Sequence, residues 1–277
     1  MKEILRRMDG ALAGRYAAAE LESVKKALCL EYLGISAVSF YTRESLPADA
    51  KRDSRLDDAL QRLVQGEPLQ YILGYTPFCG LTFHVDSRVL IPRPETAELV
   101  EWVAADNPAA GILLDIGTGS GCIAVTLACK LPGCKVQGWD ISDGALDVAR
   151  ENSRLNGVDV EFRKVDILAN PASESMFDVI VSNPPYVLES EKTQMEDTVL
   201  DHEPHTALFV PDSDALLFYR AIAHFGKRAL KPGGRLYFEI NPLKADDMKL
   251  MLATAGYHNV ELRSDIFGKL RLIKAEL

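Results

Sequence analysis

Apolar residues recur at the spacing of an α-helix through the first part of the chain. Such runs lie at residues 4–12, 21–32 and 56–64. Gly34 follows the second run in the position of a helix stop. Because helices of this length are marginal alone, residues 1–75 are predicted to pack together as a small helical bundle. The functional hypothesis for this domain is substrate docking, and the alternative is a purely structural role.

The pattern changes to alternation between residues 76 and 92. Leu81, Phe83 and Val85 alternate with polar neighbours, and a turn signal at Asp86 precedes a second apolar run at 89–91. This pattern predicts a β-hairpin, and we assign residues 76–92 as a linker between two domains. Two prolines then introduce an amphipathic helix that is expected to end near residue 105.

Strands and helices alternate along the rest of the chain. The strand candidates are 112–114, 135–139, 160–163, 177–182 and 235–240, and the helix candidates are 121–131, 142–156, 214–230 and 243–255. This alternation predicts an α/β fold with a doubly wound, Rossmann-like parallel sheet in residues 93–277. Two further strands, 259–262 and 270–275, predict an antiparallel finish.

Composition limits the partners of the chain. The apolar fraction of 47% and the charged fraction of 26% are those of a globular protein. The net charge is −9, and residues 1–75 hold 11 basic and 11 acidic residues against 20 and 29 in the remainder. Neither part has the basic excess expected for direct nucleic-acid binding. No apolar run reaches the about 20 residues of a membrane span. We expect a cytoplasmic monomer without a membrane or nucleic-acid partner.

Cysteine and histidine residues do not form a recognisable metal or disulfide pattern. There are five of each, and no pair of cysteines has the C-x-x-C spacing. Reduced thiols and no bound metal are therefore the prediction.

A glycine-rich turn follows the first predicted strand of the sheet. Gly117, Gly119 and Gly121 form a G-x-G-x-G sequence, and Cys122 stands where a dinucleotide fingerprint would have its third glycine. A P-loop is excluded because no Gly-Lys-Ser/Thr follows. Asp115, just before the turn, is unfavourable for a diphosphate but suits a cationic group such as an ammonium or a sulfonium.

Two more acidic residues follow the next two strands. Asp140 ends the second strand, where a carboxylate can accept hydrogen bonds from both ribose hydroxyls, and Asp166 follows the third strand. Each residue alone is better explained as a helix cap or a solvated turn residue. Because the carboxyl ends of parallel strands form the ligand site of α/β folds, Asp115, Asp140 and Asp166 together favour S-adenosylmethionine over NAD.

These features resemble the class I S-adenosylmethionine-dependent methyltransferases. The resemblance implies that Asp115 and the loop hold the methionine end of the cofactor, that Asp140 holds the ribose, and that Asp166 and Ile167 hold the adenine. The further residues implied in cofactor binding are Gly117, Thr118, Gly119, Ser120, Gly121 and Asn183.

The fourth predicted strand ends in the sequence Asn183-Pro184-Pro185-Tyr186. As structure, this sequence stops a strand, since proline gives no N–H to the ladder. As chemistry, the Asn183 side-chain oxygen and the Pro184 carbonyl can accept both N–H bonds of a planar amine and direct its lone pair at a methyl donor. Tyr186 can stack on the planar group. Catalysis would depend on positioning and electrostatics.

The NPPY sequence resembles that of methyltransferases acting on planar amines, which include adenine N6 and glutamine N5. Other segments distinguish these substrates. The segments 66–74, 90–96 and 203–208 resemble the peptide chain release factor glutamine-N5 methyltransferases, the PrmC/HemK family. The resemblance covers essentially the whole chain and implies methyl transfer to the glutamine of the Gly-Gly-Gln motif in class I release factors. It also implies that Asn183 to Tyr186, including Pro185, bind this glutamine.

Two departures and two alternatives accompany this interpretation. Ile167 gives an apolar face where an aromatic residue often lies, and Glu239-Ile240-Asn241 replaces the Glu-x-Gly ending of many members. The alternatives are an adenine-N6 methyltransferase of DNA or RNA and a non-catalytic S-adenosylmethionine-binding protein. The acidic charge argues against the first, and the intact NPPY sequence against the second.

Overall fold

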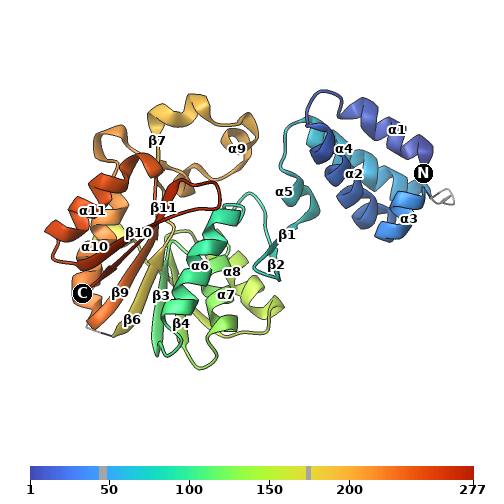
Figure 1. Cartoon of the computed structure of the whole chain (residues 1–277). Coiled ribbons are helices and arrows are strands. Elements are labelled where there is room, and N and C mark those ends of the chain that lie inside the picture. Colours follow the sequence, from blue (N-terminus) through green and yellow to red (C-terminus); the bar gives the residue numbers. More distant parts are fainter. Residues whose placement is uncertain (44–48, 173–175) are drawn as a thin grey trace. The chain divides into compact units, whose positions relative to one another are not determined.

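A computed structural model describes residues 1–43, 49–172 and 176–277. The chain divides into two compact units. The first contains residues 1–74 together with 196–202, and the second contains residues 75–195 and 203–277. Figure 1 shows the elements of both units.

The first unit is helical, as predicted. Its helices are α1 (Lys2–Ala11), α2 (Ala18–Leu33), α3 (Ala37–Thr42), α4 (Ala50–Val64), α5 (Leu69–Leu73) and the short α9 (Asp197–His202). The predicted periodic positions form its core, where Met8, Leu28 and Leu56 are fully buried. Gly34 adopts a left-handed φ of 64° and ends α2. No sequence pattern placed α9 in this unit.

A β-hairpin with a two-residue turn begins the second unit. Strands β1 (Tyr75–Phe78) and β2 (Leu81–His84) are antiparallel, with Phe78 opposite Leu81. Cys79 and Gly80 have φ of 49° and 78°, the two positive values that a type I′ turn requires. The hairpin packs on α8 (Asp143–Leu155), where Asn152 bonds both the N–H and the carbonyl of His84.

The prediction that residues 89–91 form the second strand of this hairpin was wrong. Residues 89–91 do not form a strand, and β2 pairs instead with the segment before it. The Ile91 N–H donates to the Glu203 carboxylate at 3.1 Å, and Pro92 has no N–H to give a ladder. The turn at Asp86 is present, because its side chain accepts from the Arg88 N–H.

The second unit is built on a seven-stranded sheet with the order β10-β11-β9-β6-β3-β4-β5. Its strands are β3 (Ile112–Ile116), β4 (Lys135–Asp140), β5 (Val160–Lys164), β6 (Phe177–Ser182), β9 (Leu230–Glu239), β10 (His258–Ser264) and β11 (Leu270–Glu276). Five strands are parallel, and β11 is antiparallel to both β9 and β10. This confirms the predicted doubly wound sheet and its antiparallel finish. The strand order reverses between β3 and β6, where α/β folds bind ligands.

Helices cover both faces of the sheet. Helices α6 (Pro94–Asp106), α7 (Cys122–Lys130) and α8 lie on one face, and α10 (Leu217–Ala229) and α11 (Ala245–Thr254) lie on the other (Figure 1). The central strands β3 and β6 are buried on both sides, which explains their almost continuous apolar sequence.

Several short elements lie between the strands and helices. They are the parallel pair β7 (Val187–Leu188) and β8 (Phe209–Val210), and 3-10 turns at Ile167–Ala169, Glu189–Gln194, His205–Ala207, Asp212–Asp214 and Pro242–Lys244. The predicted helix 214–230 begins later, at Leu217, because Pro211 starts the separate turn 212–214. Among the described helices, none has the length and apolar character needed to cross a membrane.

Candidate functional site

The residues predicted to carry the chemistry meet at the carboxyl ends of the parallel strands. Asp115 is next to last in β3, Asp140 is the last residue of β4, and Asn183 directly follows β6. Ser182 pairs with Phe238 in β9, so Asn183 and Glu239 lie at the same level. The edge of the sheet therefore brings together side chains that are far apart in the sequence.

The glycine-rich loop is fixed by β4. The Trp139 carbonyl accepts from the N–H groups of Gly117 and Thr118 at 2.8 and 2.9 Å. Gly117, Gly119 and Gly121 have φ of 73°, 54° and 79°, a region that other residues rarely adopt. Ser120 is buried at 2% exposure. The loop therefore leads directly into α7 in a conformation that favours glycine.

Asp115 is fully buried beneath this loop. Its Oδ2 accepts from the Thr118 hydroxyl at 2.6 Å, whereas Oδ1 has no hydrogen-bond partner in the described part of the chain. Burial raises the pKa of Asp115 to about 7, and the Thr118 hydroxyl and the Ala124 backbone counteract this rise. A buried carboxylate oxygen without a partner is costly and suits a cationic ligand.

The carboxylates of Asp140 and Asp166 both accept hydrogen bonds from nearby backbone N–H groups. The two Asp140 oxygens accept from the N–H groups of Gly119 and Ser142 at 2.9 Å each. Burial raises the pKa of Asp140, and these N–H donors counteract the rise. Each oxygen keeps a second lone pair for a ligand hydroxyl. Asp166 caps the following turn by accepting from Leu168 N–H.

Ile167 lies mainly in the core. Its side chain is 9% exposed and packs in the cluster that contains Trp139 and Phe177. The Asp140 and glycine-loop residues are adjacent, whereas Ile167 presents little surface. Its contact with an adenine ring therefore stays a prediction.

The NPPY loop is held by a buried hydrogen-bond network. Asn183 Nδ2 donates to the Thr96 hydroxyl at 3.3 Å, and the Thr96 hydroxyl donates to Glu239 Oε2 at 2.6 Å. The Tyr186 hydroxyl donates to Glu239 Oε1 at 3.0 Å and accepts from Arg271 at 3.2 Å. Burial strongly raises the pKa of Tyr186. The hydroxyl of Tyr186 is therefore fixed by Glu239 and Arg271.

A pocket opens beside this loop. Its lining residues are Leu90, Arg93, Asn183, Pro184, Tyr186, Val187, Ala207 and Leu208. All but Val187 come from residues 90–96, from the NPPY sequence or from residues 203–208. Pro185 is half-buried and belongs to the same loop.

Glu239, Arg271 and the contact of Thr96 with Asn183 were not predicted. Glu239 ends β9, so the rule that identified Asp115 and Asp140 could have found it. Thr96 begins α6, and no local pattern relates it to Asn183. Arg271 lies on an antiparallel strand 85 residues beyond Tyr186, and only the sheet order brings the two together.

Asn241 explains one departure from the family pattern. Its Nδ2 donates to the Tyr186 carbonyl at 3.2 Å and to Glu191 Oε2 at 3.0 Å. Its Oδ1 accepts from Leu243 N–H at 3.0 Å. The segment after β9 thus supports the NPPY loop through a side chain that glycine would lack.

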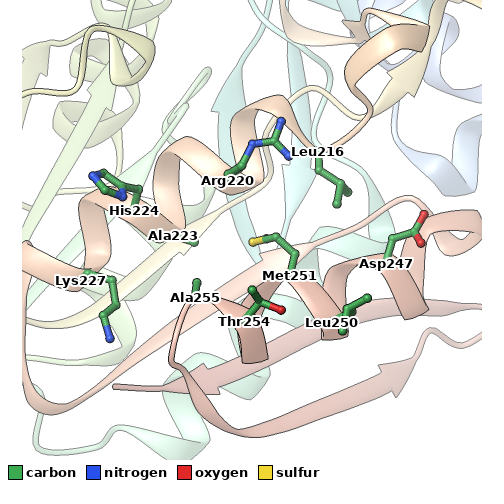
Figure 2. Close-up of a pocket in the computed structure, with 10 residues that line it drawn as sticks. All are labelled: Leu216, Arg220, Ala223, His224, Lys227, Asp247, Leu250, Met251, Thr254 and Ala255. Carbon is green, nitrogen blue, oxygen red and sulfur yellow. The ribbon is translucent and has the colours of Figure 1, made fainter.

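A second described pocket contains none of the predicted site residues, and the described residues hold no metal-binding cluster. Within residues 1–43, 49–172 and 176–277, no group of three or more His, Cys, Asp or Glu side chains has a metal-binding arrangement. This pocket is a groove lined by residues of α10 and α11, among them His224, Lys227 and Met251 (Figure 2). None of the predicted site residues lines it.

Two solved structures share the fold of this chain. A methyltransferase from Pyrococcus furiosus aligns with a TM-score of 0.50 and 18% identity over 82% of this chain and 98% of that chain. The T. thermophilus 16S rRNA N2 G1207 methyltransferase, in complex with AdoMet and guanosine, aligns with a TM-score of 0.52 and 19% identity over 73% of this chain and 49% of that chain. At these identities the likeness concerns the fold alone, and it confirms the predicted class I methyltransferase sheet.

Sequence comparison identifies the family. The models described as Methyltransferase small domain and PrmC N-terminal domain match residues 95–205 and 3–74. The release factor glutamine methyltransferase of Bacteroides thetaiotaomicron is 46% identical over 276 residues, covering 99% of both chains. That of Flavobacterium psychrophilum is 42% identical over 95% of this chain and 94% of its own. The chain belongs to the release factor glutamine methyltransferase family.

Proposed function

We propose that this chain transfers a methyl group from S-adenosylmethionine to the side-chain amide nitrogen of the glutamine in the Gly-Gly-Gln motif of class I release factors. The observation that carries the proposal is the placement of Asn183 and Pro184 beside the glycine loop and Asp115, on one edge of the sheet. The family supplies the class of substrate, and the geometry supports the roles of the residues.

The residues around the glycine loop fit the cofactor. Asp115 has a buried oxygen without a partner among the described residues, which suits the ammonium group of the methionine end. Asp140 retains lone pairs for the ribose hydroxyls, and the glycines allow close approach of the ligand to the backbone. Bound S-adenosylmethionine supplies an electrophilic methyl group on a sulfonium.

The NPPY loop would hold the substrate amide. The nitrogen of an amide is a poor nucleophile because its lone pair is delocalised into the carbonyl. When Asn183 Oδ1 and the Pro184 carbonyl accept its two N–H bonds, they favour a pyramidal nitrogen and stabilise the positive charge that develops on it. Pro185 adds no competing N–H donor. The Tyr186 ring, fixed by Glu239, provides a flat surface for the amide.

Methyl transfer with labelled cofactor tests the proposal. The protein is incubated with S-adenosylmethionine labelled in the methyl group and either an unmodified release factor or DNA. We expect label in the release factor and none in DNA or in a release factor with the motif glutamine changed to alanine. Label in DNA, or label that survives that change, would contradict the proposal.

The Asn183→Ala variant tests the role of the loop. We expect it to lose turnover because one acceptor of the substrate amide is removed, while binding of S-adenosylhomocysteine persists at the separate Asp115 site. Loss of both would mean that Asn183 acts on the cofactor. A role in translation termination, a cytoplasmic location, a monomeric state and the absence of nucleic-acid or membrane partners stay predictions.

A further inference from the structure

Three side chains, those of Thr96, Glu239 and Tyr186, connect Asn183 to the positive charge of Arg271. Thr96 lies between Asn183 and Glu239, and Tyr186 lies between Glu239 and Arg271. Thr96 is 3% exposed and Glu239 is 1% exposed. Because solvent hardly reaches these two groups, their hydrogen bonds must be satisfied within the network.

The direction of the protons follows from the Arg271 end. A guanidinium group has only donors, so the 3.2 Å contact of Arg271 Nη1 uses the Tyr186 oxygen as an acceptor. The single proton of the Tyr186 hydroxyl is then directed at Glu239 Oε1, 3.0 Å away. Glu239 is therefore an acceptor on this side.

The other oxygen of Glu239 is also an acceptor. The distance from Thr96 Oγ1 to Oε2 is 2.6 Å, typical of a hydroxyl donating to an ionised carboxylate. Burial raises the pKa of Glu239, and the Thr96 and Tyr186 hydroxyls and the nearby Arg271 charge counteract this rise. The carboxylate thus fixes the orientation of the Thr96 hydroxyl.

This orientation determines which end of the Asn183 amide faces Thr96. The single Thr96 proton is directed at Glu239, so Thr96 offers Asn183 only a lone pair. Nδ2 is a donor and can bind there, whereas Oδ1 is an acceptor and cannot. Oδ1 consequently faces away from Thr96, and no donor from the described residues binds it.

We propose that Thr96, oriented by Glu239, is a positioning residue that holds the Asn183 amide with Oδ1 directed at an N–H of the substrate glutamine. The inference rests on the proposed function, in which Asn183 binds that amide. An Asn183 side chain rotated by half a turn would present donor to donor and would lose the contact. The carboxylate therefore acts on the substrate through Thr96 and Asn183, without touching it.

Paired substitutions of Thr96 test the role of its hydroxyl. Thr96→Val keeps the shape and removes the hydroxyl, and we expect kcat to fall by about 10–100-fold, the scale of misorienting a reactant. Thr96→Ser keeps the hydroxyl and should retain most of the activity. Binding of S-adenosylhomocysteine should be unchanged in both. A Ser variant as impaired as the Val variant, or a fully active Val variant, would refute the relay.

Glu239→Gln provides a second test that preserves side-chain shape. The amide introduces a donor where the network needs two acceptors, so one of the two hydroxyls loses its acceptor. We expect a loss of kcat similar to that of Thr96→Val, and a double variant no worse than the more impaired single variant, because both changes release the same amide. Losses that multiply in the double variant would show independent roles.

A spectroscopic measurement separates this inference from the proposed function. The side-chain NH₂ signals of Asn183 are assigned in ¹⁵N-labelled protein by their absence in Asn183→Ala. Thr96→Val and Glu239→Gln should both shift these signals and speed their exchange with water, whereas Thr96→Ser should not. Unchanged signals in the first two variants would overturn the relay even in an active enzyme. A wild-type protein that methylates no release factor would instead overturn the function and leave this readout standing.

Discussion

The Glu203 carboxylate accepts a hydrogen bond from Arg93 Nη2 at 2.5 Å, across 110 residues of sequence. Its other oxygen accepts from Ile91 N–H at 3.1 Å. The Glu203 side chain is 1% exposed and that of Arg93 is 33% exposed. Arg93 lines the pocket beside the NPPY loop, and Thr96 follows one turn later in α6. Glu203 therefore holds the segment that brings Thr96 to the site.

Replacing Glu203 should destabilise the fold. Glu203→Ala leaves the buried Ile91 N–H unpaired and removes the partner of Arg93, which retains some contact with water. We expect the free energy of unfolding to fall by about 1–3 kcal/mol, the usual cost of an unsatisfied buried group. Urea denaturation measures this loss.

The exposed pair of Arg150 and Asp147 is a matched control in the same unit. Its side chains are 41% and 61% exposed, and its atoms lie 2.9 Å apart. Asp147→Ala should change the free energy of unfolding by at most about 0.5 kcal/mol, since water and salt screen such a pair. Equal losses in both variants would show that the Glu203 contacts stabilise the fold no more than an exposed ion pair does.

The architecture of the sheet was predictable because each of its cues is local. A strand of continuous apolar residues, a glycine turn and an acidic strand end can each be read from a few neighbouring positions. Asp115, Asp140 and Asn183 were found in this way. The hairpin was misassigned because the Cys79-Gly80 turn carries a weaker signal than the turn at Asp86, and two-residue turns are decided by backbone φ.

The supporting residues of the site could not be predicted in the same way. Thr96, Glu239 and Arg271 act through partners 53 to 143 positions away, which only the fold brings close. Their roles follow from the hydrogen-bond donors and acceptors that face one another in a buried site. Only the three-dimensional structure shows which groups these are. A sequence pattern identifies the groups that touch a ligand more readily than the groups that orient them.

Gly138 should not tolerate a side chain. A Cβ at this position would lie 2.7 Å from the Phe162 ring and 2.9 Å from Thr118 Oγ1. Gly138→Ala should therefore displace the hydroxyl that bonds Asp115, reduce the free energy of unfolding by about 1–3 kcal/mol and weaken binding of S-adenosylhomocysteine. Denaturation and calorimetric titration measure the two effects.

Gly10→Ala is the contrasting control. Gly10 lies in α1, a methyl group added there would have nothing within 4 Å, and its φ is not in the left-handed region. We expect this change to stabilise the protein by about 0.5–1 kcal/mol through helix propensity and to leave cofactor binding unchanged. If both variants change stability and cofactor binding to the same extent, crowding at Gly138 does not explain the effect of Gly138→Ala.

Removing the Tyr186 hydroxyl should affect both stability and turnover. Tyr186→Phe leaves Glu239 Oε1 and Arg271 Nη1 without this partner in a buried site. We expect a loss of about 1–3 kcal/mol in the free energy of unfolding. The ring is also freed from its anchor beside Asn183, so kcat should fall.

Tyr257→Phe separates these two effects. The Tyr257 hydroxyl is also buried and donates to the Ala223 carbonyl at 2.8 Å, on the face of the sheet covered by α10 and α11. This variant should lose stability on a similar scale and keep the kcat of the wild type. An equal loss of kcat would mean that turnover reports only general destabilisation.

The pKa of Asp115 predicts how cofactor binding depends on pH. Burial raises this pKa to about 7 in the ligand-free protein, whereas a cationic group binds only the ionised carboxylate. Affinity for S-adenosylhomocysteine, which carries an ammonium group, should therefore rise between pH 5.5 and pH 7.5, by up to about tenfold per unit below the pKa. Calorimetric titration across this range measures the slope.

Asp115→Asn tests whether this carboxylate is the group that titrates. The variant should bind S-adenosylhomocysteine weakly and with little dependence on pH. In the ligand-free protein, the raised pKa makes the contribution of Asp115 to stability most favourable below its ordinary pKa and diminishes it as the pH rises toward 7. The variant should therefore lose less stability than the wild type between pH 5 and pH 7.5. If wild type and variant share the same pH profile of affinity, another group holds the cation.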